Sequence, residues 1–217
     1  MSLIELKNIT FRYEKGEEAV LRDLSLLISE GRCVLLRGDN GSGKTTLIRI
    51  LSGLSFPQEG SYFFKDIRID ELYLRDNRRS KLFHKEVGLL FQNPDTMLFN
   101  TTVFDEVAFG PRQMGLSDEE VEERVMDCLK LLGIEDLKDR VPYHLSGGQK
   151  KWVALAAVLS LNPEVLILDE PFAGLDRKRG EQLVSLLKEL KQAGKTIIMA
   201  SHEEDLLEGL IDDFRDI

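Results

Sequence analysis

The sequence has only two cysteines, a single tryptophan and no long uninterrupted apolar run. Cys33 and Cys128 lie far apart in separate apolar segments, which shows neither metal-ligand spacing nor a disulfide framework and favours a reducing compartment. A bilayer-spanning helix needs roughly 20 apolar residues, and the N-terminal apolar stretch is interrupted by Glu5 and Lys7. We therefore expect a chain that is neither exported nor membrane-spanning by itself.

The sequence also lacks an excess of positive charge. Its 29 lysines and arginines face 38 aspartates and glutamates, for a net charge of −9, and no basic run offsets this locally. This balance disfavours a duplex-binding surface, so we expect no direct nucleic-acid partner. With 217 residues, 42% of them hydrophobic, the chain can bury the core of one large domain or two small ones.

The N-terminal part of the chain reads as strands followed by a helix. Residues 2–13 and 20–28 predict a hairpin around the charged turn 14–18. The short apolar run 33–36 is typical of a strand buried on both faces, and a helix follows whose apolar positions run from Leu47 to Leu54.

The rest of the chain alternates in character. Residues 87–91 predict another buried strand, whereas residues 94–162 predict helices and turns, including a helix capped at Ser117. Buried strands return at 165–168 and 196–200, separated by a helix over 177–193. This alternation of strand and helix predicts an α/β fold with a mostly parallel sheet.

A glycine-rich loop between the strand 33–36 and the following helix fits the pattern G-x-x-x-x-G-K-[ST]. Its glycines let backbone N–H groups point at phosphate oxygens, Lys44 supplies charge to the β- and γ-phosphates, and Thr45 offers a hydroxyl to Mg²⁺. A glycine-rich turn with an incidental lysine is the alternative, but all four fixed positions and both flanks agree with the pattern. The expected nucleotide-binding residues are Gly38, Asp39, Asn40, Gly41, Ser42, Gly43, Lys44, Thr45 and Thr46.

Two carboxylates, Asp169 and Glu170, follow the apolar strand 165–168. Alone, such a pair is usually a solvated turn or a helix cap. Because side chains alternate in a strand, adjacent acids serve different purposes. Beside a phosphate loop, Asp169 suits the Mg²⁺ shell, and Glu170 can orient or deprotonate the attacking water.

The segment Leu145–Gln149, with sequence LSGGQ, precedes an amphipathic helix. A serine and two glycines at a helix start can bind phosphate, although in isolation a plain N-cap would be the better explanation. Together with the phosphate loop and the string VLILDE in this order, the segment resembles the ATP-binding-cassette (ABC) ATPases, and the resemblance covers essentially the whole chain.

The resemblance implies a P-loop NTPase core of mostly parallel sheet, with an N-terminal antiparallel β subdomain and an inserted helical subdomain. A single domain over 1–217 would then have its RecA-like core at 1–93 and 163–217 and its helical subdomain at about 94–162. In this family two cassettes enclose two ATP molecules. We therefore expect a homodimer, or a heterodimer with a second ABC ATPase, in which the signature loop of one subunit acts on the nucleotide of the other; its residues are Ser146, Gly147, Gly148 and Gln149.

The resemblance also implies roles for four isolated residues. Gln92 would link Mg²⁺ and water to the membrane partner, so that Thr45, Gln92 and Asp169 are the expected Mg²⁺ residues, and His202 would contact the γ-phosphate. Asp176 would act at the subunit interface. Tyr13 would stack on adenine, although a core aromatic is nearly as plausible because Phe11 would share its strand face.

Within the family, the string Gln92–Pro94 followed by residues 102–111 is similar to energy-coupling-factor and cobalt-type importers. Those proteins power the uptake of vitamins or transition-metal ions such as cobalt and nickel through a transmembrane subunit, from the cytoplasmic face of the membrane. A cassette for cell division or lipoprotein release is the alternative. A soluble nucleic-acid-linked ABC ATPase is less favoured, because the stretch between Lys44 and Asp169 has no room for a long coiled coil.

Trp152 departs from the family pattern, which usually has arginine at this position. Two environments fit the sequence. The indole either lies partly wet near the closing interface, or packs as a core aromatic on the helix face of Leu155, Ala156 and Leu159.

Overall fold

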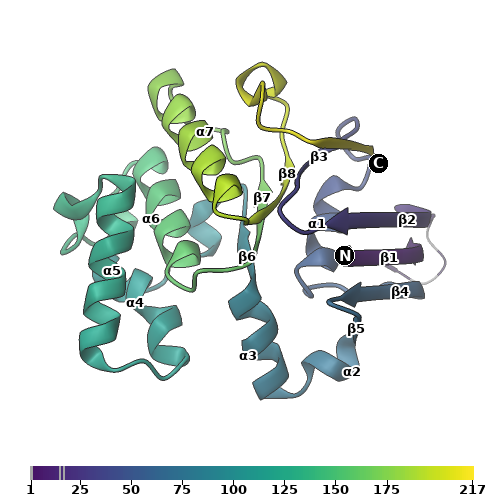
Figure 1. Cartoon of the computed structure of the whole chain (residues 1–217), viewed down its shortest axis with the longest axis horizontal. Helices are drawn as coiled ribbons and strands as arrows, with labels where there is room; N and C mark the ends of the chain where they lie inside the picture. The colour runs from purple at the N-terminus through teal and green to yellow at the C-terminus, as the bar shows by residue number, and fades with distance from the viewer. Residues whose placement is uncertain (1, 15, 17) are drawn as a thin grey trace.

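The computed structural model of the protein describes residues 2–14, 16 and 18–217. An antiparallel sheet lies at one end of the molecule, a group of helices at the other, and a parallel sheet between them (Figure 1). The predicted fold class is therefore confirmed.

The antiparallel sheet has the order β2-β1-β4-β5. The predicted hairpin is present, since β1 pairs antiparallel with β2, although β1 ends at Phe11 and not at residue 13. Lys15 and Glu17 of the predicted turn lie outside the described residues. The strands are β1 (Ser2–Phe11), β2 (Leu21–Ser29), β4 (Glu59–Phe64) and β5 (Ile67–Ile69).

The second sheet has the order β6-β7-β8-β3-β9, and its neighbouring strands are parallel. All residues of β7 and β8 are buried, as expected for strands covered on both faces. The strands are β3 (Cys33–Arg37), β6 (Val87–Leu90), β7 (Val165–Asp169), β8 (Thr196–Ala200) and β9 (Asp213–Asp216).

Seven α-helices are assigned in the described part of the chain, with 3₁₀ turns at Pro94–Thr96, Glu135–Leu137, Pro142–His144 and Glu204–Leu207. They are α1 (Lys44–Leu51), α2 (Glu71–Leu74), α3 (Asn77–Glu86), α4 (Val103–Gln113), α5 (Asp118–Leu132), α6 (Gly147–Leu159) and α7 (Arg177–Gln192). None of the helices in the described residues is both long and apolar enough to cross a membrane.

The parallel sheet separates two hydrophobic cores. Alternate residues of β3 point to opposite faces, so that Cys33 and Leu35 join the core under α4–α7 while Val34 and Leu36 join the core of α1 and the antiparallel sheet. Both cysteines are buried free thiols. Burial raises the pKa of the Cys33 thiol to about 12, so it stays protonated and packs as an apolar side chain.

The helical stretch predicted over 94–162 contains α4, α5 and α6 and no strand among its residues, all of which are described. Helix α5 starts with the expected cap: Ser117 and Glu120 form a reciprocal capping box. The apolar stripe predicted for this helix is buried in full, namely Val121, Val125, Cys128, Leu129 and Leu132.

A further predicted boundary is also wrong, at the end of the helix that follows the phosphate loop. The helix predicted to reach Leu54 ends at Leu51, because Gly53 turns the chain with a left-handed φ of 68°. Leu54 is consequently 43% exposed. Strands β4, β5 and β9 and helices α2 and α3 were not predicted from the sequence.

Candidate active site

The phosphate loop connects β3 to α1. Gly43 caps α1 with a φ of 109°, and a Cβ there would lie 2.8 Å from Leu21, so a side chain would be both strained and obstructed. The Lys44 ammonium folds back over the loop and donates to the carbonyl oxygens of Gly38 (2.5 Å) and Asp39 (3.0 Å). The loop is thus curled around a buried cation at the start of a helix.

Asp169 is the last residue of β7 and lines the same cleft as the phosphate loop. It is buried, which raises its pKa, and the negative charge of Glu170 raises it further, while a hydrogen bond with Thr45 and the charge of Lys44 lower it. A hydroxyl and a carboxylate brought together beside a phosphate loop form an oxygen donor set suited to Mg²⁺. The sequence expectation for Thr45 and Asp169 therefore fits the geometry.

Glu170 lies just beyond the end of β7 and has a left-handed φ of 45°, which is uncommon for a side chain other than glycine. Its backbone N–H donates to the Ala200 carbonyl (2.9 Å). Its Oε1 lies 3.4 Å from His202 Nε2, which brings the end of β7 and the residues after β8 together. The carboxylate and the imidazole are thus in direct polar contact, and both line the cleft in which a phosphate and an attacking water would lie.

Tyr13 lies just after β1. It is 58% exposed, its hydroxyl is 2.9 Å from Thr46 Oγ1, and its ring meets Phe11 edge-on at 5.1 Å between centroids. Phe11 is the buried aromatic of the two. The core alternative for Tyr13 is therefore wrong, because the residue lies beyond the end of β1 and most of its side chain is exposed.

These groups line one open cleft of about 570 Å³. Two of its residues, Val20 and Ala173, were not expected. Of the expected set, it gathers Tyr13, Asn40, Gly41, Gly43, Lys44, Thr45, Thr46, Gln92, Asp169, Glu170 and His202. Gly38, Asp39 and Ser42 belong to the same loop, and two of them hold the Lys44 ammonium.

The signature loop does not line this cleft. Ser146 caps α6 and forms a reciprocal capping box with Gln149. A Cβ on Gly148 would approach Leu175 at 3.8 Å, which places the start of α6 beside the start of α7. Asp176 caps α7 by accepting from the Arg179 N–H (2.8 Å). The expected site residues thus fall into two groups that the fold of one chain keeps apart.

Trp152 is 4% exposed and belongs to the core beneath α4–α7. The core environment expected as one alternative is therefore the one observed, and the partly wet environment at an interface is wrong for this chain. The neighbouring residue Lys151 makes two hydrogen bonds that were not expected from the sequence. Its buried ammonium donates to the carbonyl oxygens of Glu170 (3.1 Å) and Ala173 (2.6 Å). Burial lowers the pKa of Lys151, although Glu170 raises it.

Comparison with known proteins resolves the family. Residues 21–173 match the family described as ABC transporter. The chain belongs to the ABC transporter family.

Relatives of this ABC cassette include importer proteins. The nickel import ATP-binding protein LarO of Lactiplantibacillus plantarum is 53% identical over 200 residues, covering 92% of this chain and 82% of LarO. The energy-coupling factor transporter ATP-binding protein EcfA of Methanosphaera stadtmanae is 43% identical over 213 residues, covering 98% of this chain and 74% of EcfA.

Solved ABC cassettes share the fold. The dimeric cassette MJ0796, in a post-hydrolysis state with ADP and Pi, superposes with a TM-score of 0.85 at 33% identity, covering 94% of this chain and 89% of MJ0796. This chain is accordingly an ABC-type ATPase that binds ATP.

Proposed function

We propose that this ABC ATPase is the ATP-hydrolysing subunit of a membrane importer, and that its cargo is a transition-metal ion or a vitamin. The observation that carries the enzymatic part is the cleft in which Lys44 and Thr45 face Asp169, Glu170 and His202. The names of LarO and EcfA support the importer part.

In this proposal the residues of the cleft have different roles in ATP hydrolysis. The loop from Gly38 to Thr46 holds the phosphates through its backbone N–H groups and Lys44. Thr45, Asp169 and Gln92 would hold Mg²⁺, which neutralises charge on the phosphate oxygens. Glu170 positions the attacking water and accepts its proton, and His202 contacts the γ-phosphate. Tyr13 is exposed at the cleft edge, where its ring can meet adenine.

The signature loop requires a second subunit. Ser146, Gly147, Gly148, Gln149 and Asp176 lie outside the cleft of their own chain, at two helix starts that can approach a nucleotide held by another cassette. The dimeric MJ0796 structure supports this arrangement. We propose that two cassettes, identical or unlike, enclose the nucleotides.

A groove of about 290 Å³ beside the Gln92 segment offers a place for the membrane subunit. Phe99 (66% exposed) and Phe109 (43% exposed) line it, and their rings meet edge-on with 5.0 Å between centroids. Glu106, itself buried, accepts the N–H groups of Phe99 and Asn100 (both 2.8 Å) and so fixes one wall. We propose that an apolar segment of a transmembrane subunit fills this groove, which places the cassette peripherally on the cytoplasmic face of the membrane.

In this proposal the chain is one ABC ATPase domain. Residues 1–93 and 163–217 form the RecA-like core that holds the nucleotide, and residues of about 94–162 form the helical subdomain that carries the signature loop.

Substitution of Glu170 tests the enzymatic part. Glu170→Gln keeps the side-chain shape but cannot accept the proton, so we expect ATP binding to persist and turnover to fall by ~10²–10⁴. Lys44→Ala should instead lose ATP binding. Glu208→Gln, which changes an exposed carboxylate outside the cleft, is the matched control and should hydrolyse ATP normally. Wild-type turnover in Glu170→Gln would refute the assignment.

Fractionation of cells tests the importer part. The chain should sediment with membranes when its membrane subunit is present, and Phe109→Asp should release it because a charge enters the apolar groove. Leu72→Asp, at a leucine that is 76% exposed on α2 outside the groove, should stay bound. Equal release of both variants would contradict the groove as the docking site.

A further inference from the structure

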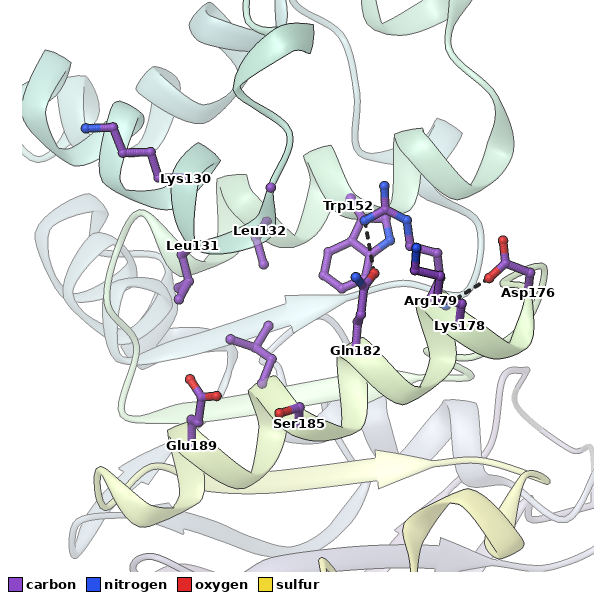
Figure 2. A pocket seen from close by; sticks show the side chains of 12 residues that line it. Lys130, Leu131, Leu132, Trp152, Asp176, Lys178, Arg179, Gln182, Ser185 and Glu189 are labelled. Atoms are coloured by element: carbon purple, nitrogen blue, oxygen red, sulfur yellow. Dashed lines mark hydrogen bonds between the residues drawn. The ribbon is translucent and has the colours of Figure 1, made fainter.

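A cavity of about 650 Å³ lies between α5, α6 and α7, outside the nucleotide cleft (Figure 2). On its wall the guanidinium carbon of Arg179, from α7, lies 5.3 Å from the centroid of the Trp152 ring, from α6. This is the separation of a cation–π contact, and the burial of Trp152 removes competing water. One side-chain pair thus joins the two helices.

Arg179 is fixed at both ends. Its backbone N–H donates to the Asp176 carboxylate at 2.8 Å, and its Nη1 donates to Gln182 Oε1 at 3.2 Å, as Figure 2 shows. The residue that stacks on α6 is therefore the same residue that closes the capping turn of Asp176. Displacement of the guanidinium would disturb this turn.

The indole of Trp152 takes part in this contact through the face of its ring and not through its N–H group. Within the part of the chain that the structure describes, no group accepts a hydrogen bond from Trp152 Nε1. Another aromatic ring can consequently replace it, whereas a cation cannot.

Helix α6 is also attached to the neighbouring segment by Lys151, whose ammonium holds the carbonyl oxygens of Glu170 and Ala173. Two adjacent residues of α6 therefore hold both ends of the segment 170–179. This segment carries Glu170 at one end and Asp176 near the other.

We infer that Trp152 and Arg179 are positioning residues that hold the Asp176 turn against the signature helix α6. The inference rests on the proposed function, in which Asp176 and Ser146 both face the nucleotide of a second subunit. The pair makes these two parts of the interface move together when the dimer closes. The pair also explains why tryptophan and not the usual arginine suits position 152. An arginine there would face Arg179, and the two guanidinium groups would repel each other.

Hydrogen exchange of the nucleotide-free chain tests the contact directly. In Trp152→Arg, we expect the amides of 174–180 to exchange about ten-fold faster, the size of effect that one shielded cation–π contact supplies. The double variant Trp152→Arg/Arg179→Glu replaces the cation–π contact with an ion pair and should return exchange to near the original rate, and Trp152→Phe should stay close to that rate. Arg177→Met is the matched control, because Arg177 is exposed and pairs with Glu181.

Dimerisation tests the consequence. In the Glu170→Gln background with ATP, the concentration for half-dimerisation should rise about ten-fold in Trp152→Arg and recover in the double variant Trp152→Arg/Arg179→Glu, while ATP affinity stays unchanged. A purely structural role would lower the unfolding midpoint and leave dimerisation of the folded protein unaltered. Unchanged amide exchange at 174–180 in Trp152→Arg would overturn the inference. Faster exchange in a Glu170→Gln chain that never dimerises would support the contact and refute the homodimer.

Discussion

Asp169 is a carboxylate whose surroundings disfavour its charge. Its pKa is raised above the ordinary value of 3.8, chiefly by burial and by Glu170. A carboxyl with a raised folded-state pKa binds protons more tightly when folded, so the free energy of unfolding falls as the pH rises through the interval above 3.8. Asp169→Asn removes this penalty. We expect its urea midpoint at neutral pH to increase while ATP hydrolysis is lost.

Asp212 provides the opposite case as a control. Burial raises its pKa, but hydrogen bonds from Lys191 and the Cys33 N–H outweigh burial and lower the pKa overall. Its contribution to stability is present above the unfolded pKa and is lost as the pH falls through the folded one. Asp212→Asn should therefore lower the urea midpoint at neutral pH. Midpoints that move in the same direction for both variants would contradict this account.

The sequence predicted residues whose spacing is local and missed Lys151, whose backbone partners lie about 20 residues further along the chain. The phosphate loop is recognisable because all of its fixed positions lie within eight residues of chain. Lys151 was missed because it binds two carbonyl oxygens, which every residue carries. The environment of Tyr13 depended on where β1 ends, and strand ends are set by tertiary pairing more than by local pattern.

At the scale of elements, two glycines should respond oppositely to alanine. A Cβ on Gly88 in β6 would lie 2.6 Å from Val158 and 2.9 Å from Pro163, so Gly88→Ala should destabilise the fold by about 1–3 kcal/mol. A Cβ on Gly180 in α7 would meet Leu206 at an ordinary 3.5 Å, so Gly180→Ala should stabilise the helix by about 0.5–1 kcal/mol.

Urea unfolding of the two variants provides the measurement. The double variant Gly88→Ala/Val158→Ala serves as the control for Gly88, because removal of the Val158 methyl groups relieves the closest contact. It should be less destabilised than the sum of its two single variants. Additive losses would show that the collision is not with Val158.

Two of the elements that the sequence did not predict, α3 and β9, are largely solvated. Helix α3 has one buried residue, Phe83, and β9 has none, so neither carries a clear apolar period. By contrast, α5 was predicted to its first residue, because its cap and five buried positions repeat the helical period. The helix after the phosphate loop was predicted too long because Leu54 continued the period beyond Gly53.

At the scale of the whole molecule, ATP should drive association. The signature loop cannot serve the cleft of its own chain, so a complete site needs a second subunit. We expect Glu170→Gln with Mg-ATP to sediment as a dimer and to return to a monomer when nucleotide is removed. Lys44→Ala should remain monomeric under both conditions. A Glu170→Gln chain that remains monomeric with bound ATP would indicate that an unlike cassette completes the pair.

The order of strands in the parallel sheet also fixes when the phosphate loop can form during synthesis. Strand β3, which leads into this loop, pairs with β8 and β9, and more than 150 residues of chain lie between them. The antiparallel pairs of β1, β2 and β4 can form long before those partners leave the ribosome. A chain interrupted before β8 thus carries the complete ATP-binding motif on a strand without its lateral neighbours. We therefore expect the phosphate loop to reach its nucleotide-binding geometry only after β8 has been synthesised and has paired with β3.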